Sequence, residues 1–210
     1  MSWLMPFSRD TGGPAVSPLT LIGCGIFQEE VENLLAGLDP PPAVTWLPVG
    51  LHDNVETLEA ALDQALAEAR AEGGPAGFLF GFGCLPEMRA FATARGAALL
   101  PARNCLTALA GEEGLKELEK DRTLVASPGW VRKMWLGRVG TAGGWQADDY
   151  RQNFGRYDRV LVLDPGLSPL TDEEIITCYD LIQTPLEIRP LDLGHLRLAL
   201  EELLATARKN

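Results

Sequence analysis

The sequence has few basic residues and no long apolar run. Its 210 residues include 18 Lys and Arg against 29 Asp and Glu, which gives a formal net charge of −11. This surplus of carboxylates repels phosphate backbones and anionic lipid headgroups, so we expect neither nucleic acid nor a membrane as a partner. No apolar stretch reaches the length of about eighteen residues that marks a membrane-spanning helix.

The N-terminus lacks the features of a secretory signal. Its apolar patch is short and weakly basic, and Gly, Pro and Ser gather from Thr11 to Pro18. Residues 1–18 are therefore expected to be a flexible lead-in, and the protein is expected to be cytoplasmic. In that reducing compartment the four cysteines are expected to be free thiols or metal ligands, since disulfides are rare there.

Short apolar runs alternate with amphipathic segments along the chain, without internal repeats or low-complexity tracts. The runs predict strands at 19–24, 43–49, 77–83, 97–101, 123–127, 159–164 and 186–189. The amphipathic segments predict helices at 28–38, 54–72, 87–95, 106–120, 171–183 and 195–208. This alternation predicts a single α/β domain over residues 19–210, with a mostly parallel sheet, helices on both faces and a Rossmann-like open arrangement.

One segment interrupts the alternation. Residues 129–157 contain "TAGG" and three of the five tryptophans, with several Arg and Lys among the aromatic residues. The segment is expected to be a lid or an insertion, or else an irregular crossover between strands.

Reactive side chains follow the predicted strands at their carboxyl ends, where ligands bind in open α/β sheets. Cys24 ends the first strand, His52 follows the second, Cys84 follows the third and Cys105 follows the fourth. Three thiolates and an imidazole suit zinc or an iron–sulfur cluster, and three protein ligands leave one coordination position open. Helix N-termini after Cys24 and Cys105 are expected to lower the thiol pKa values, which favours ligation.

Other interpretations of these residues remain open. Buried cysteines often serve only as small apolar side chains, and no C-x-x-C spacing is present. A histidine directly after a strand is also often a turn residue or a polar cap, so His52 need not be a metal ligand. The run from Gly23 to Gln28 resembles a dinucleotide-binding fingerprint whose third glycine is replaced by Gln28, and no acidic residue ends the second strand. Cys178 lies on the apolar stripe of a helix and is expected in the core.

Five short motifs occur in a fixed order: "GCGIF", "WLPVGLH", "GFGC", "PARNC" and "SPGW". The series, from about Leu19 to Trp130, resembles an uncharacterised bacterial and archaeal family, domain of unknown function 1638. The resemblance implies a site made of Cys24, His52, Cys84, Cys105 and Trp130. Trp130 and Arg103 are the candidates for contacting a cofactor.

The chain departs from the family pattern in two places. The His-Asp pair before the last cysteine of the motifs is Arg103-Asn104 here, which removes a ligand or a base, and Cys84 stands one position early in its glycine-rich turn. Members of the family are often associated with corrinoid-dependent methyl transfer. A corrinoid or methyltransferase protein is therefore an expected partner, beside a small-molecule substrate.

Three functions compete at this stage. The first is a metal-thiolate protein of one-carbon or methyl transfer, in which a zinc ion or iron–sulfur cluster binds an incoming thiol or passes electrons. The second is a cofactor-free enzyme whose cysteines act as acid and base, as in two-thiol racemases. The third is a non-enzymatic accessory protein that binds a corrinoid or another small molecule. The first is the function that we expect.

Overall fold

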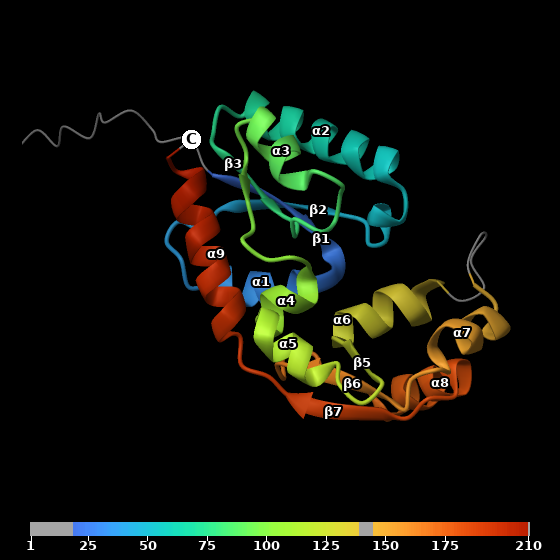
Figure 1. The fold of residues 1–210 in the computed structure, drawn as a ribbon. Helices are drawn as coiled ribbons and strands as arrows, with labels where there is room; N and C mark the ends of the chain where they lie inside the picture. The colour runs from blue at the N-terminus through green and yellow to red at the C-terminus, as the bar shows by residue number, and fades with distance from the viewer. Residues whose placement is uncertain (1–18, 139–144, 210) are drawn as a thin grey trace, which may run out of the picture.

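The structure, a computed structural model, describes residues 19–138 and 145–209. The expected N-terminal lead-in and residues 139–144 of the interrupting segment lie outside these ranges. The prediction of an α/β fold with parallel strands is confirmed. The strands form two sheets, whereas the sequence indicated one (Figure 1).

The first sheet has the strand order β2-β1-β3-β4 and is parallel throughout. Its strands are β1 (Thr20–Cys24), β2 (Ala43–Leu47), β3 (Ala76–Leu79) and β4 (Ala98–Leu99). β1 has β2 on one side and β3 on the other, so the chain reverses its direction across the sheet after β2. Crevices for ligands form at the carboxyl ends of strands beside such a reversal.

Helices pack around this sheet. They are η1 (Gly25–Phe27), α1 (Gln28–Leu35), η2 (Leu51–Asp53), α2 (Val55–Ala71), α3 (Met88–Ala94), α4 (Cys105–Ala110) and α9 (Gly194–Ala207). The next helix after α4, α5 (Glu112–Leu118), packs through Leu115 on the second sheet instead. α2 buries one stripe against the sheet, at the helical spacing that the sequence shows. The predicted helix 106–120 is instead two helices. Gly111 separates them at a φ of +74°, a conformation that side chains other than glycine rarely adopt.

The second sheet has the order β5-β6-β7 and is also parallel. Its strands are β5 (Thr123–Ala126), β6 (Arg159–Asp164) and β7 (Leu186–Pro190). The helices of this part are α6 (Pro128–Trp130), the π-helix η3 (Val131–Trp135), η4 (Leu136–Arg138), α7 (Ala147–Phe154) and α8 (Asp172–Ile182). The described part of segment 129–157 thus belongs to the crossover from β5 to β6. The capping box predicted at Thr171 and Glu174 begins α8.

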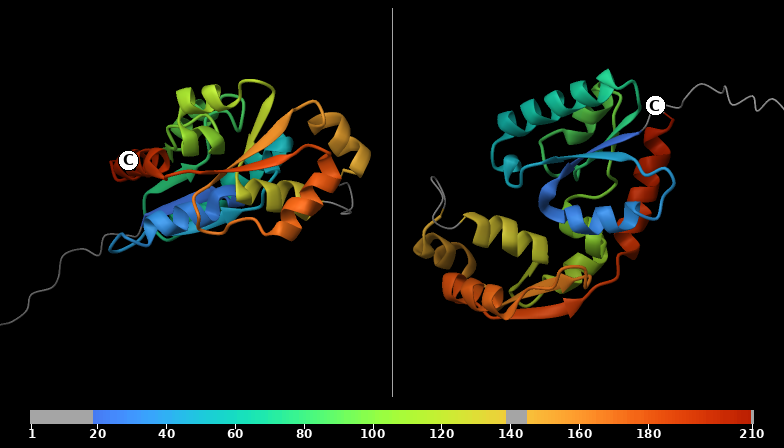
Figure 2. Two further views of the ribbon diagram at one scale, coloured as in Figure 1. Left: turned by 90° about the horizontal axis from the view of Figure 1, so that it is seen from below. Right: turned by 180° about the vertical axis from the view of Figure 1, so that it is seen from behind.

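The two parts are joined through the last helix and through shared side chains. Figure 1 and the rear view in Figure 2 show α9 running from the second sheet back along the first. Five α9 residues are buried in the core of the first sheet, which also contacts Trp130 and Met134 from the second part. Trp130 packs on the core of the second part as well, so its ring lies at the junction. No described helix combines the length and the apolar composition that crossing a bilayer requires.

Candidate functional site

Three strand exits of the first sheet open into one pocket. Cys24 is the last residue of β1, Cys84 follows β3, and Cys105 is the first residue of α4 after β4. All three line a cavity of about 280 Å³, together with His52 and Trp130. The structure therefore brings together the thiols, the imidazole and the indole that the sequence singled out.

The second and third thiols are placed by two loops in close backbone contact. The N–H of Phe82 donates to the carbonyl of Ala102 (2.9 Å), and the N–H of Gly83 donates to that of Arg103 (2.8 Å). A Cβ at Gly81 would lie 2.2 Å from the carbonyl oxygen of Arg103, so only glycine allows this approach. The glycines of "GFGC" therefore bring the loop of Cys84 against the loop that leads to Cys105.

A similar contact joins the second part of the molecule to Cys24. A Cβ at Gly129 would lie 2.3 Å from the carbonyl oxygen of Ile26, two residues beyond Cys24. Ser127 caps α6 by accepting a hydrogen bond from the N–H of Trp130 at 3.2 Å. This close approach of the "SPGW" turn places the Trp130 side chain on the wall of the thiol pocket.

The rest of the pocket wall is largely apolar. Side chains that line it besides those of the predicted site are Ile26, Phe27, Leu79, Phe80, Leu106 and Met134. Asn104 also lines it, but its amide oxygen accepts from the N–H of Thr107 (2.9 Å) as the cap of α4. The thiols therefore lie in surroundings that solvate an anion poorly.

Burial dominates the acidity of these thiols. It raises the pKa of Cys24, although a backbone hydrogen bond at Ile26 and the charge of Lys133 act in the opposite direction. Burial, followed by the neighbouring Cys24, raises the pKa of Cys84 to about 11. Burial, followed by Cys24 and Cys84, raises the pKa of Cys105 to about 12. The thiols are thus close enough to influence one another, and each is protonated at neutral pH.

The expectation of lowered thiol pKa values was wrong for this pocket. Cys24 and Cys105 do precede or begin helices, as expected. However, η1 has 3 residues and α4 has 6, so their dipoles are short, and the loss of solvation outweighs them.

One cation from the second part lies near Cys24. The ammonium group of Lys133 in η3 donates a hydrogen bond to the carbonyl of Gly25, the residue after Cys24. Its charge lowers the pKa of Cys24 and also that of the buried carboxyl of Glu30, although burial raises both overall. Lys133 is therefore placed to compensate negative charge that develops at Cys24.

The thiols are gathered but not arranged as a finished ligand set. In residues 19–138 and 145–209, no three His, Cys, Asp or Glu side chains stand in positions that could hold an ion. Ligation by Cys24, Cys84 and Cys105 therefore requires that their sulfur atoms move closer together.

His52 lies at the rim of the pocket. Its side chain is 48% exposed and its Nε2 lies 3.7 Å from Oδ1 of Asp53, whose Oδ2 accepts a hydrogen bond from Arg138 at 2.8 Å. His52 also lines a second cavity of about 420 Å³, which it shares with Trp130 and Met134 and which is otherwise lined mainly by aromatic side chains of the second part. The imidazole thus faces solvent more than the sulfur atoms do.

Arg103 does not line the thiol pocket. Its side chain is 63% exposed, lies 3.9 Å from Glu112, and lines a separate groove with His195. The neighbouring Asn104 takes the position in the pocket because it caps α4. The structure therefore gives no support to the expectation that Arg103 contacts a cofactor in this pocket.

Sequence reasoning did not assign Lys133 and Met134 to the site. The sequence does show a cluster of basic and aromatic residues there, but nothing local indicates the π-helix that turns both side chains toward the first sheet. π-Helical turns are often found at functional sites. Cys178, in contrast, is fully buried in the core of the second part, as expected, and burial raises its pKa to about 12.

Comparison with known proteins gives a family but no activity. A family model described as "Protein of unknown function (DUF1638)" matches residues 46–200. No curated protein matches the chain. Among solved structures, the chain is similar to a mutant tryptophan synthase alpha-subunit from the hyperthermophile Pyrococcus furiosus, with 13% identity, a TM-score of 0.21, and coverage of 90% of this chain and 98% of that one.

Proposed function

Because this chain belongs to a family of proteins of unknown function (DUF1638), we propose its function from the pocket itself. Cys24, Cys84 and Cys105 hold a zinc ion or an iron–sulfur cluster that serves one-carbon or methyl transfer. The observation that carries the proposal is that thiols from three separate strand exits line one cavity of about 280 Å³. Core packing alone does not require three sulfur atoms at one edge of a sheet.

Metal binding in this pocket is coupled to the loss of protons. The pKa values of about 11 and 12 at Cys84 and Cys105 mean that an incoming ion must displace thiol protons at neutral pH. Three thiolates around a divalent ion leave a net negative charge in an apolar site, and Lys133 at the Gly25 carbonyl offsets part of it. Affinity for the ion should therefore rise with pH.

The cavity limits the size of a substrate. Pockets for drug-sized ligands occupy about 300–1,000 Å³, and this one lies just below that range. A tetrahedral ion with three protein ligands has one open position, which a small thiol substrate could occupy as the more nucleophilic thiolate. The apolar wall formed by Phe80, Met134 and Trp130 would keep water from that thiolate. A corrinoid or methyltransferase protein as the other partner is part of the same proposal and rests on the family resemblance.

The acid/base alternative has less support. Two-thiol proton transfer requires one cysteine to be a thiolate before the substrate arrives, and burial raises the pKa of all three pocket thiols. Exchange of solvent deuterium into an amino acid, lost when Cys24 or Cys84 is replaced, would favour that alternative over the metal centre.

The proposal is tested by quantifying zinc, iron and acid-labile sulfide in protein purified without oxygen. We expect stoichiometric zinc, or iron with sulfide, in the wild type and large losses in Cys24→Ala, Cys84→Ala and Cys105→Ala. Cys178→Ala is the matched control because this thiol lies in the other core, outside the pocket. Metal-free wild type that takes up zinc no better than the three variants would rule the proposal out.

A further inference from the structure

β7 is an edge strand whose outer side is exposed. It pairs with β6 on one side only, and no other described strand adjoins it. Residues 187–190 are exposed, and the Ile188 side chain is 44% exposed. Figure 1 shows β7 at the lower margin of the molecule, and in the view from below in Figure 2 it crosses the side that faces the viewer. Exposed strand edges are templates for pairing with another strand.

The backbone hydrogen bonds between β6 and β7 show which N–H and carbonyl groups of β7 point toward the free edge. The backbone carbonyl of Pro185 accepts a hydrogen bond from the N–H of Val160 (2.8 Å), and the N–H of Leu191 donates one to the carbonyl of Asp164 (3.0 Å). Both of these groups therefore face β6. Backbone groups of alternate residues in a strand point to opposite edges. Leu186, Ile188 and Pro190 therefore direct their backbone groups to the free edge, where Pro190 contributes only a carbonyl.

These groups match those of a second copy in antiparallel orientation. When Ile188 lies opposite Ile188 of the second copy, the N–H of each donates a hydrogen bond to the carbonyl of the other. The N–H of Leu186 in each copy then donates to the carbonyl of Pro190 in the other copy. With the two bonds between the Ile188 residues, the pairing makes about four hydrogen bonds, and none of them requires an N–H from Pro190.

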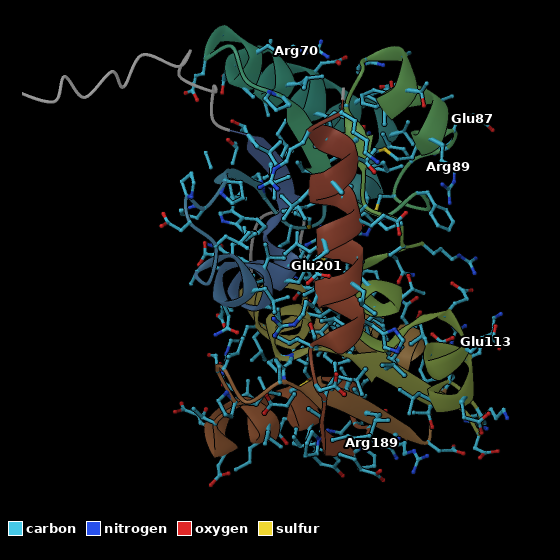
Figure 3. The ribbon with its side chains drawn as sticks, turned by 90° about the vertical axis from the view of Figure 1, so that its left-hand side faces the viewer. Arg70, Glu87, Arg89, Glu113, Arg189 and Glu201 are labelled. Carbon is cyan, nitrogen blue, oxygen red and sulfur yellow. The ribbon has the colours of Figure 1, made fainter. Side chains whose placement is uncertain are left out.

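The side chains are self-complementary in the same register. Glu187 comes opposite Arg189 of the copy, which gives a pair of opposite charges on each side of the twofold axis. On the other face, Ile188 meets its own copy. This face is covered by α8, which leaves Ile176 and Tyr179 exposed, at 61% and 45%. Figure 3 shows Arg189 at the lower margin, where a neighbouring copy could reach it.

We propose that the free edge of β7 is a homodimer interface, at which two copies join their second sheets into one continuous sheet. Antiparallel pairing of identical strands generates a closed twofold dimer and leaves no further edge of β7 for growth. The interface lies on the second sheet, whereas the thiols lie on the first, so the proposal is independent of the metal centre.

Charge variants test this interface, with mass measured in solution across a hundredfold range of concentration. Arg189→Glu and Glu187→Arg each place like charges opposite one another and should weaken dimerisation about tenfold or more. The double variant exchanges the two charges and should restore the dimer. An equimolar mixture of the two single variants should form a heterodimer. Lys209→Glu, with a like change of charge at an exposed site beyond the end of α9, is the control.

Thermal unfolding and hydrogen exchange complete the test of the β7 interface. Glu187 also forms an exposed ion pair with Arg159 (3.2 Å), so thermal unfolding of each variant must show that it is folded. Hydrogen exchange at the Ile188 amide should slow as the dimer forms. A wild type that stays monomeric overturns the proposal, and slow exchange in that monomer would mean that a segment of the same chain covers the edge. A dimer that Arg189→Glu leaves intact also overturns it.

Discussion

The contact between Gly81 and the loop of Arg103 gives the sharpest prediction about the pocket. A Cβ at Gly81 would lie 2.2 Å from the Arg103 carbonyl oxygen and 2.4 Å from its carbonyl carbon, both of which are backbone atoms. A relaxed carbon–oxygen contact is about 3.3 Å, so Gly81→Ala must separate the two loops by about 1 Å. Cys84 lies three residues after Gly81, and Cys105 lies two residues after Arg103. The substitution should therefore move their sulfur atoms apart.

We expect Gly81→Ala to lower the free energy of unfolding by about 1–3 kcal/mol, the usual cost of overpacking. Affinity for zinc should fall about ten- to hundredfold, as when residues that orient metal ligands are altered. Urea unfolding and competition with a chromophoric zinc chelator measure the two effects.

Gly114→Ala is the matched control for Gly81→Ala. Gly114 lies in α5, and its Cβ would meet no heavy atom within 4 Å. This substitution should stabilise the helix by about 0.5–1 kcal/mol and leave zinc binding unchanged. Wild-type stability and wild-type zinc affinity in Gly81→Ala would refute the close packing of the two loops.

Three further predictions concern the second part of the molecule and the thiols. Arg132→Lys should destabilise the protein by about 1–3 kcal/mol in urea unfolding, because Arg132 makes two hydrogen bonds to the partly buried Glu174, at 2.6 and 3.0 Å; an unchanged midpoint would contradict this. Lys133→Met should raise the pKa of Cys24 further and slow its alkylation at pH 8, while equal rates would mean that the ammonium group does not act on the thiol. The free energy of unfolding of the metal-free protein should fall as pH rises from about 9 to 12, because burial raises the folded-state pKa of Cys105 to about 12, so the unfolded state loses this proton first. Cys105→Ala should show a smaller fall, and identical slopes would count against this assignment.

The local order of the sequence was enough to predict that three of the four cysteines share one pocket. Cys24, Cys84 and Cys105 each follow a strand of a parallel sheet, and such strands end at one edge. The same reasoning assigned Cys178 to a core through its position on an apolar stripe, and the capping box at Thr171 through a local pattern. These features depend on neighbours in the sequence or on the common direction of parallel strands.

Features that depend on distant contacts were not predictable. β5 pairs with β6, and its residues say nothing about whether β4 is a neighbour, so the division into two sheets was missed. Lys133 reaches Gly25 across 108 positions of the chain, through a π-helix without a sequence signature. Arg103 lines the groove beside α5 and Asn104 lines the pocket, and this choice depends on a single step along the loop that the sequence does not indicate.

The thiol pKa values illustrate a balance that the sequence could not give. Helix starts near Cys24 and Cys105 were correctly expected, and a helix dipole does favour a thiolate. Burial raises the pKa of both thiols, and the pocket in which they lie is lined by segments far apart in the sequence, including Trp130 and Met134 of the second part.

X-ray absorption spectroscopy of the protein loaded with one equivalent of zinc tests the central claim most directly, because it reports the atoms bound to the ion. We expect three sulfur atoms at about 2.3 Å, and two in Cys105→Ala. A zinc environment of nitrogen and oxygen alone in the wild type, or one that is unchanged by Cys105→Ala, would contradict the claim that the three pocket thiols share an ion.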